Sequence, residues 1–178
     1  MRPRLEKGLV QVYTGPAKGK STAAFGLTVR AVGHGFRVFI IQFMKGMANY
    51  GELAAFKRLA PECIVENFGG KGWVVKGQAK PEDISEAQKA MARAEEVILS
   101  DDWDIVILDE INNAIWFDLI DVAAVLRLID KKPERVELVL TGRNAPPEIV
   151  TAADLVTEME NIKHPCDHGI GARKGIEY

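Results

Sequence analysis

The sequence predicts an α/β protein in which a mostly parallel sheet carries helices on both faces and binds a nucleotide phosphate. Two observations lead to this expectation. Short apolar, β-branched runs alternate along the chain with longer amphipathic or alanine-rich runs, which is the pattern of strands joined by crossover helices. A glycine-rich segment at 15–22 separates the first strand-like run from the first helix-like run, as in a phosphate-binding loop.

The hydrophobic pattern fixes the expected order of elements. Short runs rich in Val, Ile, Leu and Phe predict strands at 9–13, 37–43, 63–67, 104–109, 136–141 and 154–158. Intervening segments with helical apolar spacing predict helices at 20–32, 51–59, 82–99, 112–130 and 146–152. The glycine-rich stretch 69–77 matches neither pattern, so we expect a long loop there, of a kind that often carries function.

The glycine-rich loop is the most specific functional signal in the sequence. Its residues are Gly15-Pro16-Ala17-Lys18-Gly19-Lys20-Ser21-Thr22. Small residues let backbone N–H groups approach phosphate oxygens, and the following helix directs its positive dipole end to the same point. Lys20 would add an ammonium group, and Ser21 or Thr22 a hydroxyl for a bound Mg²⁺. The loop is one residue shorter than the usual pattern, so GTPase-like hydrolysis is not assumed.

An acidic pair follows the predicted strand 104–109, where Asp109 is followed by Glu110. We expect this strand to lie beside the phosphate-loop strand, with both carboxylates at its carboxyl edge, next to the phosphates. Hard oxygen ligands suit Mg²⁺. The sequence therefore predicts a magnesium site at Ser21, Asp109 and Glu110; the alternative is an ordinary surface turn.

Composition places the chain among soluble, cytoplasmic globular proteins. Its 178 residues, of which 47% are hydrophobic and 27% charged, suit a single domain over 1–178. A formal net charge of −2 gives no support for nucleic-acid binding, and no apolar run is long enough to cross a bilayer. The N-terminal residues lack the apolar stretch of a secretory signal. Cys63 and Cys166 are predicted to be free thiols.

Further motifs occur in one order over nearly the whole chain, at 14–15, 18–26, 30–35, 42–46, 51–52, 108–112, 140–147, 153–159, 163–165 and 174–178. Together they resemble the phosphate-loop type of ATP:corrinoid adenosyltransferase, whose loop is also one residue short. The resemblance implies that Co(I) of a reduced corrinoid attacks C5′ of ATP and that triphosphate leaves. It also implies a reversed orientation of ATP in the loop, a reductant such as a flavin protein, and a homodimer.

The resemblance assigns roles to individual residues. It implies phosphate binding by the loop residues, Mg²⁺ binding by Ser21 and Glu110 with Asp109 as a further neighbour, and catalytic roles for Lys20, Glu110 and Trp73. Arg30 and Arg143 are candidate nucleotide or phosphate contacts, because a guanidinium pairs with two phosphate oxygens. For either arginine the alternative is a surface salt bridge.

The chain departs from the family pattern in its glycine-rich loop and near its C-terminus. Val75 stands where a second aromatic residue follows Trp73. We therefore expect Trp73 alone to cover the lower face of the corrinoid; the alternative is that it anchors the loop on the core. Asn113 replaces a common Tyr.

The C-terminal departure creates a run of zinc-ligand types, His164, Cys166 and His168. No second ligand motif accompanies it elsewhere in the sequence, so a structural metal is the less favoured interpretation.

Other function classes share the phosphate loop. A small-molecule kinase, for example one acting on a nucleoside, or an ATPase would release ADP, whereas a nucleotide sensor would release nothing. Only the transferase would release triphosphate, so analysis of the products separates these alternatives.

Overall fold

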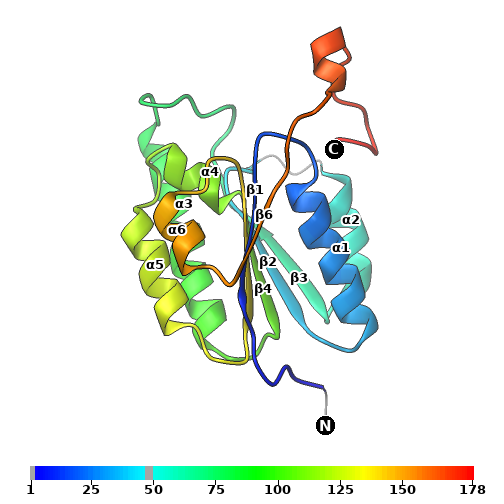
Figure 1. The fold of residues 1–178 in the computed structure, drawn as a ribbon, viewed down its shortest axis with the longest axis vertical. Helices are drawn as coiled ribbons and strands as arrows, with labels where there is room; N and C mark the ends of the chain where they lie inside the picture. The colour runs from blue at the N-terminus through cyan, green and yellow to red at the C-terminus, as the bar shows by residue number, and fades with distance from the viewer. Residues whose placement is uncertain (1–2, 47–49) are drawn as a thin grey trace.

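A computed structural model describes residues 3–46 and 50–178, and its ribbon shows a central sheet between two layers of helices (Figure 1). Within this part of the chain the sheet has six strands, all parallel, in the order β3-β2-β4-β5-β1-β6. The strands are β1 (Val10–Thr14), β2 (Val38–Gln42), β3 (Cys63–Asn67), β4 (Ile105–Asp109), β5 (Glu137–Thr141) and β6 (Leu155–Glu158). The predicted strands and their parallel direction are confirmed.

Helices cover both faces of the sheet, as predicted. On one face lie α1 (Lys20–Gly33) and α2 (Gly51–Phe56), with the 3₁₀ turn η1 (Lys57–Leu59) continuing α2. On the other lie α3 (Pro81–Leu99), α4 (Ile111–Trp116), α5 (Val122–Lys131) and α6 (Pro147–Ala152). A second 3₁₀ turn, η2 (Pro165–His168), follows β6. No described helix is long and apolar enough to cross a membrane.

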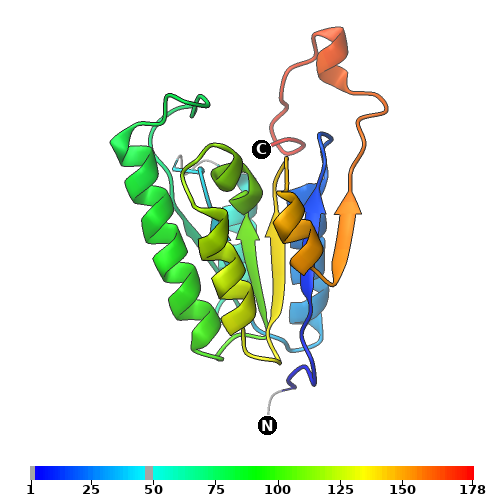
Figure 2. The same cartoon turned by 60° about the vertical axis from the view of Figure 1, so that its left-hand side comes forward.

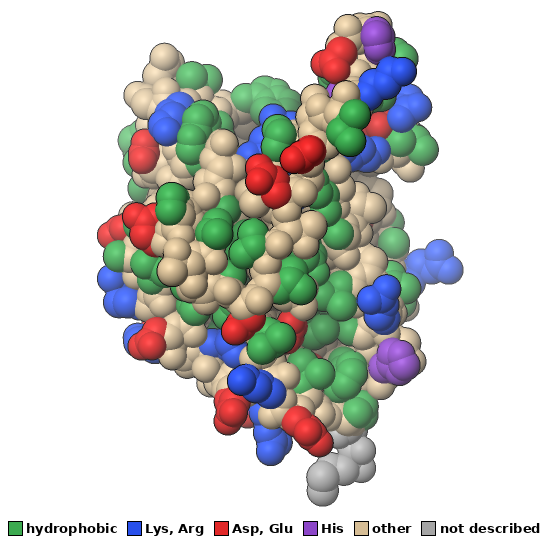
Figure 3. Space-filling model, viewed as in Figure 1, with side chains coloured by type: hydrophobic (Ala, Val, Ile, Leu, Met, Phe, Trp, Pro, Cys, Tyr) green, Lys and Arg blue, Asp and Glu red, His purple; other side chains and the backbone are tan. Residues whose placement is uncertain are grey.

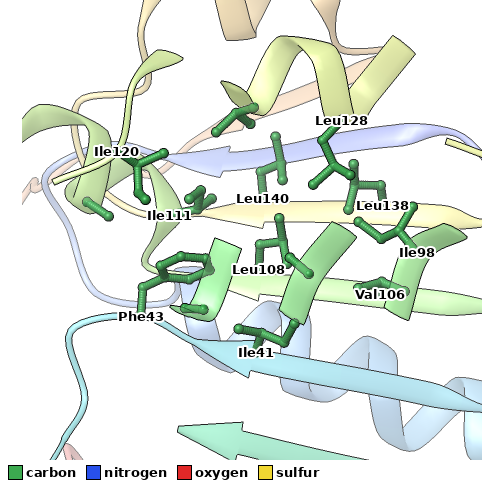
Figure 4. Close-up of a cluster of buried hydrophobic side chains, with 14 of the residues drawn as sticks. Ile41, Phe43, Ile98, Val106, Leu108, Ile111, Ile120, Leu128, Leu138 and Leu140 are labelled. Atoms are coloured by element: carbon green, nitrogen blue, oxygen red, sulfur yellow. The ribbon is translucent and has the colours of Figure 1, made fainter. Parts of the chain in front are cut away.

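The strands at the centre are buried on both faces, so their apolar residues alternate between two cores. Every residue of β2, β4 and β5 is buried, whereas every residue of β6, at the edge, is exposed. Alternate strand residues such as Ile41, Leu108 and Leu140 join the core under α3–α6 (Figure 4). Their chain neighbours, such as Ile40 and Ile107, pack under α1 and α2. Double coverage explains why these strands read as continuous apolar runs.

The predicted helix 112–130 is wrong, because the chain forms two helices there, α4 and α5. Between them Asp118 has a φ of 60°, which a continuing helix cannot accept. Asp121 then begins α5, and its Oδ1 accepts a hydrogen bond of 2.9 Å from the N–H of Ala123. Leu119 and Ile120 are nevertheless buried. The apolar spacing therefore continues through the break and imitates a single helix.

The expected neighbour of the phosphate-loop strand is also wrong. We expected β4 to lie beside β1, but β5 lies between them. Parallel strands still end at one edge of the sheet, so the residues that follow β4 and β1 remain on the same side of the molecule. In Figure 2 the strand arrowheads and the loop after β1 lie at the same end.

Replacement of Asp121 by Ala should lower the free energy of unfolding by about 1 kcal/mol, because α5 loses the carboxylate that caps its first turn. Urea denaturation measures the change. Asp130→Ala is the matched control, since Asp130 is exposed in the last turn of the same helix, where an acid is unfavourable. Equal destabilisation by both variants would contradict the capping role.

Candidate functional site

A cavity of about 780 Å³ opens at the carboxyl end of the sheet, above the phosphate loop. In the space-filling view this end is hollowed between two projections (Figure 3), which Figure 1 identifies as the loop before α3 and the segment after β6. The predicted site residues that line the cavity are Ala17, Lys18, Gly19, Lys20, Ser21, Thr22, Trp73, Glu110 and Arg143. Gly15, Pro16, Arg30 and Asp109 are not among its lining residues.

The phosphate loop owes its shape to contacts with Met159, which follows β6. Gly15 has a φ of 99° and Gly19 a φ of 126°. A Cβ at Gly15 would lie 2.4 Å from the carbonyl oxygen of Met159, and one at Gly19 would lie 2.8 Å from its sulfur. That carbonyl also accepts a 3.0 Å hydrogen bond from the N–H of Ala17. Both glycines are therefore required by backbone conformation and by close packing.

Lys20 lies folded against the inside of this loop. Its side chain donates hydrogen bonds to the carbonyl oxygens of Gly15, at 2.9 Å, and Ala17, at 2.5 Å. The residue is only 7% exposed. Burial lowers the pKa of its ammonium, and the nearby carboxylate of Glu110 opposes that change. The loop thus holds a positive charge directly at the cavity wall.

Asp109 is fully buried and holds three neighbouring strands together. Its Oδ2 accepts hydrogen bonds from Lys45 Nζ, at 2.7 Å, and from Gln42 Nε2, at 3.0 Å. Its Oδ1 accepts one of 2.7 Å from Thr141 Oγ1. Burial by itself raises the pKa of Asp109, but Lys45 above all, with its donors Thr141 and Ser21, holds that pKa below the usual value. Asp109 is therefore a charged structural centre beneath the cavity.

Sequence reasoning missed the roles of Gln42 and Lys45. The register places Gln42 directly opposite Asp109 on the adjacent strand. Lys45 follows the end of the same strand and reaches the same carboxylate. Motif 42–46 contained both residues, but only the pairing of β2 with β4 shows that they meet Asp109.

Glu110 turns away from the strand and reaches the cavity. Its φ is 67°, and its N–H donates a 3.0 Å hydrogen bond to Thr141 Oγ1. Asn113 donates a side-chain hydrogen bond to its carboxylate and accepts one of 2.7 Å from the N–H of Arg143. Burial, and then the charge of Asp109, raise the pKa of Glu110. Asn113 thus links two of the predicted site residues.

The oxygen donors at the cavity suit a magnesium ion that is also held by phosphate. Ser21 and Glu110 line the cavity, while Asp109 is already engaged by Lys45. Among the described residues no three His, Cys, Asp or Glu side chains gather closely enough to hold a metal. Mg²⁺ commonly takes only one or two carboxylates and completes its shell with phosphate and water. The donor set fits that mode.

His164, Cys166 and His168 likewise form no group that could hold a metal among the described residues. His164 Nδ1 accepts a 3.1 Å hydrogen bond from the N–H of Cys166, which caps the turn η2. Cys63 and Cys166 are both free, as predicted. His164 therefore has a local structural role at the start of η2.

Trp73 projects from the glycine-rich loop with 97% of its surface exposed, and it lines the cavity. The alternative that it anchors the loop on the core is wrong. Val74, the next residue of the loop, and Ala79, just beyond the end of the loop, pack against the core instead. Trp73 is left available for a substrate.

The two candidate arginines lie in different places. Arg143 lines the cavity after β5. Arg30 is exposed in the last turn of α1. Because a helix rises about 1.5 Å per residue, Arg30 lies roughly 15 Å along the axis from Lys20. The structure brings Arg143, and not Arg30, to the phosphate loop.

Replacement of Lys45 by Met should lower the free energy of unfolding by about 3–5 kcal/mol, because Asp109 would be left buried without its cation. Without Lys45, burial would raise the pKa of Asp109 above its unfolded value. The deficit should therefore shrink as the pH falls from about 8 to about 5 and Asp109 takes up a proton in the folded state. Urea denaturation across this range measures both effects.

Two further variants control this experiment. Adding Asp109→Asn to Lys45→Met should recover part of the loss, because no charge then remains buried. Lys89→Met removes an exposed lysine paired with Glu86, and it should cost no more than about 1 kcal/mol. A pH-independent deficit in the Lys45 variant would contradict the assigned role of Asp109.

Comparison with solved structures supports the fold alone. The RadB recombinase matches with a TM-score of 0.58 at 12% identity, over 90% of this chain and 78% of that one. A KaiC-like protein of Pyrococcus horikoshii matches with a TM-score of 0.54 at 13% identity, over 90% of this chain and 82% of that one.

Comparison with curated sequences is more specific. A corrinoid adenosyltransferase of a Sinorhizobium species is 43% identical over 97% of this chain and 81% of its own length. Those of Pseudomonas aeruginosa and Escherichia coli K12 are 40% and 32% identical, over 98% and 97% of this chain and 86% and 87% of theirs. A family model matches residues 6–178. The chain belongs to the ATP:corrinoid adenosyltransferase BtuR/CobO/CobP family.

Proposed function

We propose that the cavity above the phosphate loop is where this corrinoid adenosyltransferase moves the 5′-deoxyadenosyl group of ATP onto Co(I) of a reduced corrinoid. One observation supports the proposal most. The phosphate loop, the carboxylate of Glu110 and the exposed indole of Trp73 all face a single cavity. A triphosphate and a large planar substrate could therefore meet there.

The reaction needs charge stabilisation more than a protein nucleophile. An electron pair of Co(I) forms the Co–C5′ bond, the C5′–O bond breaks, and its electrons leave on the triphosphate. Lys20, the loop N–H groups and Arg143 would stabilise that negative charge, and the lining of the cavity by Lys20 and Arg143 supports this assignment. Because the nucleophile belongs to the substrate, the chain needs no catalytic Ser, Cys or His.

Mg²⁺ belongs to the proposal as a partner of the triphosphate. Ser21 and Glu110 would hold it, and it would supply positive charge against the leaving group. Asn113 keeps the Glu110 carboxylate in place for this task.

We also propose the corrinoid substrate, the pathway and the electron donor from the family to which the chain belongs. The corrinoid would be cob(I)alamin or its cob(I)yrinic acid a,c-diamide precursor, in cobalamin biosynthesis or salvage. An electron donor such as a flavin protein would supply Co(I). We also propose a cytoplasmic homodimer that does not bind nucleic acid.

Lys20→Ala should abolish adenosyl transfer in a protein that still folds, because the triphosphate loses its buried ammonium partner. The assay is adenosylcobalamin formation from chemically reduced cobalamin, with analysis of the phosphate product. Wild-type protein should release triphosphate; release of ADP would favour a kinase or an ATPase instead. Circular dichroism checks the fold, and Lys57→Ala, an exposed lysine on η1, is the control.

Trp73→Ala should reduce activity strongly when Co(II) is reduced on the enzyme, but much less when Co(I) is supplied ready-made. An aromatic ring against the lower corrinoid face would exclude water and favour a four-coordinate metal, which is easier to reduce. Electron paramagnetic resonance of bound Co(II) should lose its four-coordinate signal. Trp73→Phe should keep much of it. Equal losses in both assays with an unchanged spectrum would contradict this role.

A further inference from the structure

The glycine-rich loop, residues 69–77, is fixed to the rest of the molecule at its start. A Cβ on Gly69 would lie 2.7 Å from the backbone nitrogen of Lys45, which follows β2. A Cβ on Gly70 would lie 2.4 Å from Oδ1 of Asp83, in the first turn of α3. The first two residues of the loop are therefore held between the end of β2 and the start of α3.

Further along, the loop is more open around Trp73. Gly72 and Gly77 have φ values of 105° and 75°, and a Cβ on either would meet no atom within 4 Å. Both glycines therefore serve the backbone conformation and not close packing. Between them, Val74 packs against the core. Because glycine allows many backbone conformations, this one contact is not enough to fix how the segment Trp73–Lys76 is oriented.

Lys76 supplies a second contact by reaching Trp116 on α4. Its Nζ lies 4.1 Å from the centre of the Trp116 ring, within the range of a cation–π interaction. Lys76 is exposed and Trp116 is 38% exposed, so the contact lies at the surface. In Figures 1 and 2 the loop before α3 and the helix α4 lie at the same end of the sheet.

Trp116 is itself held in place. Its ring meets that of Phe117 edge-on, with the ring centres 4.8 Å apart and the planes at 84°, a favoured arrangement of aromatic rings. Phe117 packs against the core under α3–α6. The Trp116 ring is therefore a fixed surface on which the flexible side chain of Lys76 can rest.

The helix α4 connects this surface with the phosphate side of the site. It begins directly after Glu110 and ends at Trp116. Asn113 donates a hydrogen bond to the Glu110 carboxylate and lines the cavity. Trp116 lies three residues after Asn113 and hence on the same face of the helix. One short helix thus reaches the Glu110 carboxylate from its first turn and the Trp73 loop from its last residue.

We propose that Trp116 is a positioning residue for the corrinoid, because its contact with Lys76 sets where Trp73 stands at the cavity. The inference rests on the proposed function, since it takes the corrinoid as the ligand of Trp73. Trp116 is not among the residues that line the cavity, so it acts through the loop and not on a substrate. Its loss should weaken the use of the corrinoid and leave the use of ATP unchanged.

The test measures KM for chemically reduced cobalamin and KM for ATP with the full chain and Mg²⁺. Trp116→Ala and Lys76→Met should each raise KM for cobalamin about two- to fivefold, the effect expected when an exposed cation–π contact is lost. KM for ATP should stay at the wild-type value. Lys76→Arg should restore wild-type behaviour, because a guanidinium also stacks on an indole. Lys71→Met is the matched control, since Lys71 is another exposed lysine of the same loop.

Two double variants separate positioning from a general effect on the fold. The effects of Lys76→Met and Trp116→Ala should not add when combined, because each removes the same contact. Adding Trp116→Ala to Trp73→Ala should raise KM for cobalamin no further, because the ring that Trp116 positions is already gone. A further rise in either double variant would overturn the inference.

The remaining outcomes are also decisive. An unchanged KM for cobalamin in Lys76→Met would overturn the inference, and this exposed loop variant keeps the test valid should Trp116→Ala fail to fold. Equal rises in KM for cobalamin and ATP would show that Trp116 only stabilises α4 and Glu110, and would overturn it as well. Failure of the wild-type chain to form adenosylcobalamin would instead overturn the proposed function.

Discussion

The buried ion pair between Asp109 and Lys45 is the contact on which the arrangement of the site depends. It joins the ends of β4 and β2, and the hydrogen bond from Thr141 adds the end of β5. A buried carboxylate is costly unless it is paired and fully hydrogen-bonded, so these three strand ends are held in one register. Glu110 and Arg143 leave from two of those ends and reach the cavity with their spacing already fixed.

Local sequence patterns were sufficient for the parts of the molecule that depend on neighbouring residues. The strands, the phosphate loop and the acidic pair are each encoded within a few consecutive residues, and the structure has all of them. The position of β5 between β1 and β4 is encoded nowhere locally. It follows from packing across the whole sheet, which is why the expected neighbour of the loop strand was wrong.

The residues of the site likewise divide into those that short motifs reveal and those that only the tertiary structure reveals. Lys20 and Glu110 could be named from short motifs, because their types and spacing match phosphate and Mg²⁺ chemistry. The contacts that Lys45, Met159 and Glu177 make with the site come from segments distant in sequence. Arg30 and Arg143 were both candidate contacts on the sequence, and the structure separates them, because Arg143 lines the cavity and Arg30 does not. The break before α5 was hidden because Leu119 and Ile120 stay buried through it.

The position of β1 in the sheet determines when the phosphate loop can form during synthesis on the ribosome. Among the residues that the structure describes, β1 pairs with β5 and β6, and the N–H of Leu9 donates a hydrogen bond to Glu137 across 128 residues of chain. Domains begin to fold as their residues emerge during synthesis, but contacts of such separation form late. The phosphate loop, although it is made first, must wait for nearly the whole chain before Met159 arrives to shape it. β2 and β4 can therefore pair in the nascent chain long before the phosphate loop has the shape that binds a phosphate.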